Sequence, residues 1–376
     1  MHQIGLSYSL DTDASGPLIH NPLIDLLQAV RASGSISAAA GTLGLSYRHV
    51  WGELKRWEQR LGQPLLLWEK GRAARLSAFG DKLLWSERQA QARLAPQIEA
   101  LRAELARSFA IAFDDDAHVL SFHASHDDAL TALRTNAAGL AGRPRLHLDI
   151  RFVGSVDAIQ ALNEGRCIMA GFHAPRAAPP DSLAARTYQP LLRPGLHKLI
   201  GFASRMQGLM VRRGNPRGIA ALSDVARPGL RFVNRPRGSG TRVLLDELLA
   251  QAGIAPAQVA GYEHDEPSHA AVAQAVVAGQ ADLGLGIEAA ARARGLDFVP
   301  LVEEDYHLVC LKAALDTPPV AALRQVLAGA DWQRLLHALP GYRSAYAGEV
   351  RSMARVLPWW QYARAKPAAP CRRSAG

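Results

Sequence analysis

Three places in the sequence set small hydroxyl residues or glycines where an apolar, strand-like run passes into a helix-like one. They are Ala124-Ser125-His126, Gly154-Ser155 and Gly238-Ser239-Gly240-Thr241. A helix N-terminus leaves backbone N–H groups unpaired and carries about half a positive charge, and glycine lets a ligand approach that backbone. One serine at a helix start is most often an ordinary cap. Three such starts that face one another predict a binding site for a small anion.

Cations and imidazoles stand close to these helix starts. Three arginines surround the third start and could supply one or two full charges, namely Arg235, Arg237 and Arg242. Four histidines lie beside the motifs, namely His126, His173, His264 and His269. None has the spacing of a metal site, and a histidine at a strand end is more often a structural hydrogen-bonding group. Among them His126 and His269 are the candidate ligand residues, and His269 is the stronger of the two.

Sequence patterns of enzymes are missing around the same motifs. The run Ser125-His126-Asp127 cannot act as a catalytic triad because adjacent residues cannot form the relay, and no GxSxG elbow occurs. The GSGT segment is not followed by the GK[ST] of a P-loop, and Gly284-Leu285-Gly286 lacks the third glycine of a dinucleotide fingerprint. We therefore expect no catalytic residue, no metal, no required cofactor and no enzyme activity.

Composition limits the class of protein. The 376 residues fit two or three domains, and 48% apolar with 20% charged residues excludes a largely disordered chain. The formal net charge of +9 is concentrated at the two ends, and residues 351–376 hold six Arg or Lys and no acidic residue. A basic N-terminal part and a neutral middle part indicate that the N-terminal part binds a polyanion, whereas the middle part has another function.

Cysteine usage and the N-terminus bear on location. The 3 cysteines are far apart, which argues against a disulfide scaffold and a zinc site. The N-terminal residues show no export signal, and no run approaches the ~18 apolar residues of a membrane span. We expect a cytoplasmic protein with no membrane contact.

The front of the chain has the pattern of a helix-turn-helix. Asn21-Pro22 is a strong helix start and Gly34 can end that helix. A small-residue helix over 35–44 follows, and Ser46 caps a third helix. Its inner stripe is Val50, Leu54, Trp57 and Leu61. Two short helices joined by a tight glycine turn, the second with a donor-rich outer face, predict binding to the DNA major groove.

The predicted recognition helix and the segment after it supply the DNA contacts. The first turn reaches base edges, and cations further along the helix suit phosphates. Residues 65–77 predict a β-hairpin wing with cations near its tip. The expected contact residues are Ser46, Tyr47, Arg48, His49, Lys55, Arg56, Lys70, Arg72 and Arg75. A three-helix packing unit with a solvated basic face is the alternative.

The stretch GSISAAAGTLGLSYRHVWGELKRWEQRLGQPLL resembles the winged helix of the molybdate-responsive regulators, in GSIS-AA, LSY and the tryptophan four residues after that tyrosine. It is also similar to the LysR-type helix-turn-helix. The resemblance covers roughly residues 20–85. The molybdate-responsive family usually carries a glycine-rich wing, whereas this chain has Lys70-Gly71-Arg72-Ala73-Ala74-Arg75. The wing's own contacts are therefore left open.

A helical connector is expected next, over 81–112. Leu94, Ile98, Leu101 and Leu105 form a short heptad-like seam, and Pro96 interrupts it. We expect a kink, or two helices, at the proline. Dimerisation through the seam is favoured over packing on the chain's own domain, because a symmetric dimer spaces two recognition helices about one DNA turn apart.

From residue 117 onward strand-like and helix-like runs alternate, for instance HVLSFHA before SHDDALTALRTNAA and LHLDIRFVG before SVDAIQALNEG. Such alternation predicts an α/β fold with mainly parallel sheets, and about 230 residues suffice for two lobes with a cleft between them. We place this ligand-sensing domain at 113–350, after a DNA-binding domain at 20–80, and before a basic, partly disordered tail at 351–376.

Several blocks of the large domain, among them VGSVDAIQAL and above all NRPRGSGTR, look like the periplasmic-molybdate-binding-like domain often fused behind a winged helix. That domain has the type 2 periplasmic-binding-protein fold. The resemblance implies a site at Ser125, Ser155, the loop 237–241, His269, Glu288 and Tyr306. It implies molybdate, tungstate or a molybdenum-cofactor-related molecule as ligand, with a small carboxylate such as formate also possible.

Together these patterns predict an α/β protein with an N-terminal winged helix-turn-helix, a helical linker and a two-lobed periplasmic-binding-protein-like domain. We expect a transcriptional regulator that binds double-stranded operator DNA as a homodimer or homotetramer and senses a small anion. The alternative is a cytoplasmic molybdenum or molybdenum-cofactor binding or insertion protein that does not bind an operator. The sequence leaves open the effector, the operator, activator against repressor, and dimer against tetramer.

Overall fold

A computed structural model describes residues 21–67, 73–113, 116–140 and 145–360. The chain divides into two compact units, Met1–Ile98 and Glu99–Gly376. Among the described residues no helix is both long and apolar enough to cross a membrane.

The first unit contains the predicted helix-turn-helix, made of α1 (Pro22–Ser33), α2 (Ile36–Thr42) and α3 (Tyr47–Leu61). The caps are those that the sequence indicates: the Asn21 side chain accepts the N–H of Leu23 at 3.2 Å, and Ser46 Oγ accepts the N–H of His49 at 3.2 Å. Gly34 ends α1 with a positive φ of 64°, which favours glycine. The inner face of α3 buries Val50 and Leu54 against α1 and α2.

A short antiparallel hairpin of β1 (Leu66–Leu67) and β2 (Arg75–Leu76) follows as the wing. Glu58 of α3 accepts the N–H groups of Leu65 (2.8 Å) and Leu66 (3.2 Å), which ties the recognition helix to the wing. Two predicted contacts at the wing tip, Lys70 and Arg72, lie outside the described residues.

The connector is α4 (Ala78–Phe113), one helix with Pro96 inside it. The alternative of two separate helices is therefore wrong. Proline removes one backbone donor, and the remaining turns continue the helix across it.

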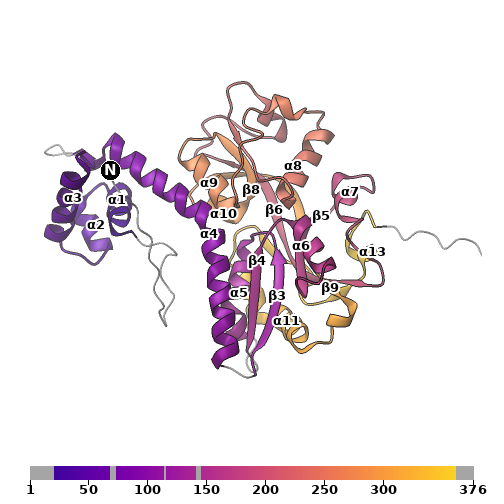
Figure 1. Cartoon of the computed structure of the whole chain (residues 1–376). Helices are drawn as coiled ribbons and strands as arrows, with labels where there is room; N and C mark the ends of the chain where they lie inside the picture. The colour runs from indigo at the N-terminus through magenta and orange to yellow at the C-terminus, as the bar shows by residue number, and fades with distance from the viewer. Residues whose placement is uncertain (1–20, 68–72, 114–115, 141–144, 361–376) are drawn as a thin grey trace, which may run out of the picture. The chain divides into compact units, whose positions relative to one another are not determined.

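The second unit is built on a nine-stranded sheet in the described residues, with strand order β4-β3-β5-β9-β6-β8-β7 and with β10 and β11 on β6 (Figure 1). The strands are β3 (His118–Ala124), β4 (Leu146–Phe152), β5 (Met169–Pro175), β6 (His197–Val211), β7 (Phe232–Val233), β8 (Leu283–Ile287), β9 (Asp297–Leu311), β10 (Tyr342–Ser344) and β11 (Val350–Arg351).

The expectation of mainly parallel sheets is wrong. Among the named strands of the described residues, only β3 with β4 and β5, and β7 with β8, pair in parallel. The two 15-residue strands β6 and β9 run antiparallel to each other in the middle of the sheet, and each is also antiparallel to its other neighbour, β8 or β5. A buried strand shows the same apolar run in either direction, so its direction cannot be read from composition. These two strands connect the parallel strands β4, β3 and β5 at one end of the sheet with the parallel pair β8 and β7 at the other end. The two parallel groups belong to the two lobes.

Helices follow the strands as predicted. They are α5 (Asp128–Leu140), α6 (Ser155–Asn163), α7 (Leu183–Tyr188), α8 (Gly240–Gln251), α9 (His269–Val277), α10 (Glu288–Arg292), α11 (Pro318–Ala328), α12 (Ala330–His337) and α13 (Met353–Val356). The folded part also extends past residue 350, where we placed the tail. Trp359 and Trp360 are buried and pack in one core cluster with α6, β5 and α7. The predicted disorder near the end of the tail lies outside the described residues.

Candidate functional site

The three predicted helix starts meet in the second unit. Ser125 follows β3 and Ser155 opens α6 after β4, and their hydroxyl oxygens are 3.4 Å apart. A Cβ on Gly240, the first residue of α8, would lie 3.3 Å from Ser155 Oγ and 3.4 Å from the Cβ of His173. A Cβ on Gly154 would lie 2.9 Å from the carbonyl oxygen of Gly238. Glycine therefore permits the close approach of the second and third starts.

The helix starts differ in how they are capped. Asp127 Oδ1 accepts the N–H groups of Ala129 (2.8 Å) and Leu130 (3.1 Å), so a carboxylate already occupies the start of α5. Ser239 caps α8 by accepting the N–H of Arg242 at 3.2 Å. Gly154 gives α6 no side-chain cap. The first junction thus offers its Ser125 hydroxyl rather than its helix N-terminus, while α6 keeps an N-terminus open to an anion.

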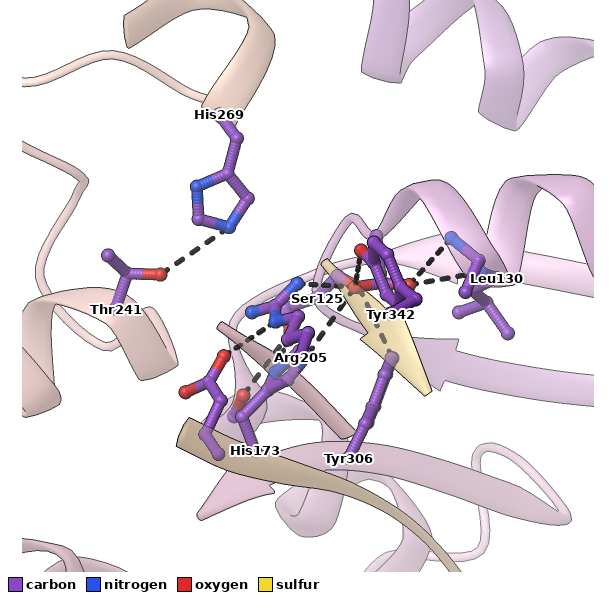
Figure 2. A network of polar contacts seen from close by, with 12 residues as sticks. Ser125, Leu130, His173, Arg205, Thr241, His269, Tyr306 and Tyr342 are labelled. Carbon is purple, nitrogen blue, oxygen red and sulfur yellow. Dashed lines mark hydrogen bonds and ion pairs between the residues drawn. The ribbon is translucent and has the colours of Figure 1, made fainter. Parts of the chain in front are cut away.

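A buried chain of polar contacts extends from Ser125 toward β6 and β9 (Figure 2). Ser125 Oγ lies 3.1 Å from His173 Nδ1, and His173 Nε2 lies 3.7 Å from Asp127 Oδ2. Asp127 forms an ion pair with Arg205, whose Nε donates to Glu304 at 2.6 Å. Burial alone would raise the pKa of Asp127, but the charge of Arg205 and the bonds from His173 and Tyr342 outweigh it and lower that pKa.

The chain of contacts continues to the other lobe. Gln207 Nε2 donates to Glu304 (2.9 Å) and to Thr241 Oγ1 (3.0 Å), and Thr241 Oγ1 lies 3.5 Å from His269 Nε2. Figure 2 shows Thr241 and His269 together, facing the group around Arg205. The network therefore links the starts of α8 and α9 to the end of β3 through side chains of the central strands.

Tyr306 packs against one side of this network. Its ring stacks on the His173 ring with centroids 3.8 Å apart, and its hydroxyl donates to the Ser125 carbonyl at 3.3 Å. A Cβ on Gly171 would lie 2.6 Å from that hydroxyl. Tyr306 is fully buried, so its geometry supports a positioning role for Ser125.

Arg235 is one of the three arginines expected to supply charge at the third helix start. It comes two residues after β7, is only 5% exposed, and its Nε and Nη1 are buried without a hydrogen-bond partner among the described residues. Burial and the charge of Arg205 lower its pKa to about 10, so it stays charged at neutral pH. In the sequence Arg235 closely follows a strand that is buried, which favours a buried side chain, whereas Arg237 lies in a turn.

The imidazoles around Arg235 are neutral. Burial and then the charge of Arg235 lower the pKa of His126 to about 4, and the same two causes hold the pKa of His269 well below its usual range. The His126 ring also packs on Phe152, with centroids 4.8 Å apart. Neutral imidazoles offer hydrogen bonds without adding charge.

Other predicted ligand residues have different partners. Arg237 has a side chain that is 78% exposed and pairs with Glu263 at 2.9 Å. Glu288 at the start of α10 pairs with Arg292 at 3.2 Å, and no contact between it and the Arg205 network is found in the described residues. Among the described residues no group of three or more His, Cys, Asp or Glu could hold a metal ion.

The predicted DNA face lies on α3 of the first unit. Tyr47, Arg48 and His49 are exposed in its first turn, beyond the Ser46 cap. Lys55 pairs with Glu58 at 2.8 Å, and Arg56 pairs with Glu53. Arg75 is exposed on β2. The face is thus accessible, and the two cations further along the helix are held by neighbouring carboxylates.

The predicted seam on α4 is largely exposed within one chain. Leu94 and Leu101 are 37% and 48% exposed, while Ile98 and Leu105 are half-buried. Phe109 and Phe113 add further exposed apolar surface to the same helix. In the described part of the chain, Leu94, Leu101, Phe109 and Phe113 therefore leave apolar surface exposed on this helix.

Comparisons with known proteins agree with this division of the chain. Residues 23–81 match the bacterial regulatory helix-turn-helix protein, lysR family, and residues 116–328 match the PBP superfamily domain. The chain is 34% identical over 200 residues to "Uncharacterized protein YvgK" of Bacillus subtilis (strain 168), covering 53% of this chain and 64% of that relative. Over 109 residues it is 34% identical to "Uncharacterized protein in ferredoxin 2Fe-2S gene 5'region" of Clostridium pasteurianum, covering 29% of this chain and 96% of that protein.

The solved structures are less similar to this chain in sequence than the two relatives above. A Corynebacterium glutamicum OxyR C206 mutant has a TM-score of 0.42 at 17% identity, covering 84% of this chain and 94% of that one. CbnR, a LysR family transcriptional regulator, has a TM-score of 0.38 at 20% identity, covering 81% and 98%. The likeness to the molybdate-responsive family stays a prediction. The chain belongs to the PBP superfamily, and its residues 23–81 match the lysR-family helix-turn-helix ahead of that domain.

Proposed function

We propose that this protein is a DNA-binding transcriptional regulator that senses a small oxyanion held between the two lobes of its second unit. The observation that carries the proposal is the meeting of Ser125, Ser155 and Thr241 in one buried network, beside an arginine with unpaired N–H groups. Hydroxyl groups, an uncapped helix N-terminus and a guanidinium are the donors that bind oxyanions. Molybdate, tungstate and a small carboxylate such as formate are the candidate effectors.

The position of these donors suits a ligand-driven change of shape. Ser125 and Ser155 belong to the lobe of β3 and β4, whereas Thr241 and His269 belong to the lobe of β7 and β8. A ligand that bonds to both sets favours the arrangement that brings them together. It shifts the equilibrium by no more than its difference in affinity for the two arrangements.

For the DNA half we propose operator binding by α3 and the wing, with two chains paired through the apolar stripe on α4. Tyr47, Arg48 and His49 are free to reach base edges, and cations on α3 and β2 suit phosphates. An isologous pairing through Leu94 and Leu101 would give the two-fold symmetry that a palindromic operator needs. A regulator of this kind works in the cytoplasm, where the chromosome lies.

The experiment that tests the proposal is calorimetric titration of the full-length protein with molybdate, tungstate, sulfate and formate. We expect saturable binding of at least one of them, with one site per chain. Gel-shift titration of the DNA immediately upstream of the gene, with and without the bound anion, should then show a change in affinity. No binding by any of the four anions would contradict the oxyanion proposal.

A further inference from the structure

We infer that the effector is a small monoanion of the carboxylate class, for which Arg235 is the counter-charge, and that the same site disfavours dianions. The inference rests on the proposed function and selects among its candidate effectors. It starts from Arg235, whose carbonyl oxygen accepts a bond from Arg242 of α8 at 3.4 Å and whose side chain has no carboxylate within ion-pairing distance in the described residues.

Arg235 differs from the other arginines near the site. Arg205 is paired with Asp127 and Glu304, and Arg242 is paired with Asp246 at 3.2 Å. Arg235 is 95% removed from solvent, and two of its nitrogens have no hydrogen-bond partner in the described part of the chain. A buried charge without a partner is costly, and an anion bound against the guanidinium removes that cost. One unpaired guanidinium calls for one negative charge.

A second negative charge would meet carboxylates rather than cations. Asp127 and Glu304 share the single charge of Arg205, so this group already carries one excess negative charge. Glu304 is joined to Thr241 through Gln207, and Asp127 lies 3.7 Å from the imidazole that contacts Ser125. Like charges in a poorly hydrated site repel strongly. A dianion held by these hydroxyls is therefore disfavoured relative to a monoanion.

The imidazoles do not change this balance. His126 and His269 are neutral beside Arg235. They supply a donor or an acceptor each but no positive charge. The site therefore combines one full cation with neutral donors, a pattern suited to a carboxylate, whose two oxygens can bond to a guanidinium and to hydroxyls together.

The spacing of the groups limits the size of the ligand. Ser125, Ser155, His173 and Thr241 are each less than 7% exposed. Ser125 lies within hydrogen-bond distance of Ser155 and His173, and Thr241 lies within that distance of Gln207. Gly240 leaves no room even for an added methyl group without a shift of Ser155. We therefore infer that the ligand has only a few heavy atoms, as formate and acetate have.

The test is calorimetric titration of the full-length protein at neutral pH with sodium formate, acetate, molybdate and sulfate at equal ionic strength. We expect formate or acetate to bind at least about tenfold more tightly than molybdate and sulfate. Arg235→Gln should weaken carboxylate binding by at least about tenfold, since a charge-assisted bond is lost. Arg213→Gln, which removes the same charge from an exposed position of the same unit, should leave binding unchanged.

Melting temperatures measured without ligand show whether each variant is folded, so a loss of binding can be separated from a loss of folding. Arg235→Gln should melt no lower than the wild type, because it removes an unpaired buried charge. Molybdate or sulfate binding as tight as that of the carboxylates, or full carboxylate binding by Arg235→Gln, would overturn the inference and leave the oxyanion sensor standing. If none of the four anions binds, the proposed function itself fails, and the inference with it.

Discussion

The hydroxyl oxygens of Ser125 and Ser155 lie 3.4 Å apart, although 30 residues of chain separate them. The pairing of β3 with β4 explains this, because parallel neighbours end at the same edge of the sheet and pass their following residues into the same space. Two serines that each look like an ordinary helix start thereby become one pair of donors. Their meeting is the geometric basis of the binding site proposed above.

The first prediction concerns these hydroxyls. The double variant Ser125→Ala/Thr241→Ala removes one donor from each lobe and should abolish the rise in melting temperature that the bound anion produces in the wild type. The reason is that each hydroxyl contributes a hydrogen bond that is made only in the liganded state. Differential scanning fluorimetry with formate and molybdate measures it, with Ser344→Ala on the exposed β10 as control. A double variant that still responds to the anion would place the site elsewhere.

The second prediction concerns the stability of the empty protein. Arg235→Met replaces an unpaired buried charge with an apolar chain of similar length. We expect the ligand-free melting temperature to rise by about 2–4 °C, in line with a gain of about 1 kcal/mol for a domain of this size. Arg205→Met should do the reverse, because it leaves Asp127 and Glu304 buried without their cation. Equal destabilisation by both substitutions would contradict the assignment.

The third prediction concerns the stability of the folded protein at acidic pH. Burial lowers the pKa values of His126, His197 and His307 to about 4, from 6.5. Between these values the unfolded chain binds protons that the folded chain does not, so stability is full above about pH 6.5 and falls as the pH drops toward 4. Asp128, whose pKa burial and the charge of Asp127 raise to about 6, acts in the opposite direction over about pH 4–6. Three imidazoles outweigh one carboxyl.

We therefore expect the urea midpoint to fall between pH 7 and pH 5. The variant His307→Asn should show a smaller fall, and His337→Asn, at an exposed position, should match the wild type. A wild-type midpoint that is constant over this range would show that these imidazoles titrate normally in the folded chain.

The fourth prediction separates base contacts from phosphate contacts on α3. Arg48→Ala should weaken operator binding by about 1–3 kcal/mol and relax the preference for the operator over other DNA. Lys55→Ala should weaken binding to all sequences alike and reduce the slope of log affinity against log salt by about 1. Gel-shift titrations at several salt concentrations distinguish the two. Equal effects on specific and nonspecific DNA from Arg48→Ala would remove it from the base-reading set.

The fifth prediction concerns the apolar stripe on α4. Leu101→Asp sets a charge at the centre of the stripe and should shift the protein from dimer toward monomer, as followed by sedimentation or light scattering. Glu104→Lys, at an exposed position on the same helix, is the matched control. Unchanged mass for Leu101→Asp would show that the stripe does not pair the chains.

Local signals predicted the helix-turn-helix well. Asn21, Gly34 and Ser46 fix helix ends by their own chemistry, and the structure places each of them as a cap. The bond from Glu58 to the wing could not be foreseen, since it joins residues that only the folded hairpin brings together. Capping is local, whereas this contact depends on tertiary structure.

The site was only partly predictable for the same reason. Hydroxyls at strand ends identified Ser125 and Ser155, because the parallel strands β3 and β4 end at one edge, and the same pattern identified Thr241 after β7 in the other lobe. The sequence does not show which arginine is paired. Arg237 and Arg235 are two residues apart, yet one is exposed beside Glu263 and the other is buried without a partner. The antiparallel course of β6 and β9, which carries Arg205 and Glu304 into the site, likewise depends on the path of distant connections.

The unpaired guanidinium of Arg235 also ties the lifetime of the protein to its signal. Proteolysis in a cell follows the fraction of chains that open, and that fraction falls when a ligand stabilises the closed form. An empty chain with an uncompensated interior charge is the easier one to degrade. We therefore expect the protein to accumulate when its effector is plentiful, a feedback on abundance that requires no additional gene.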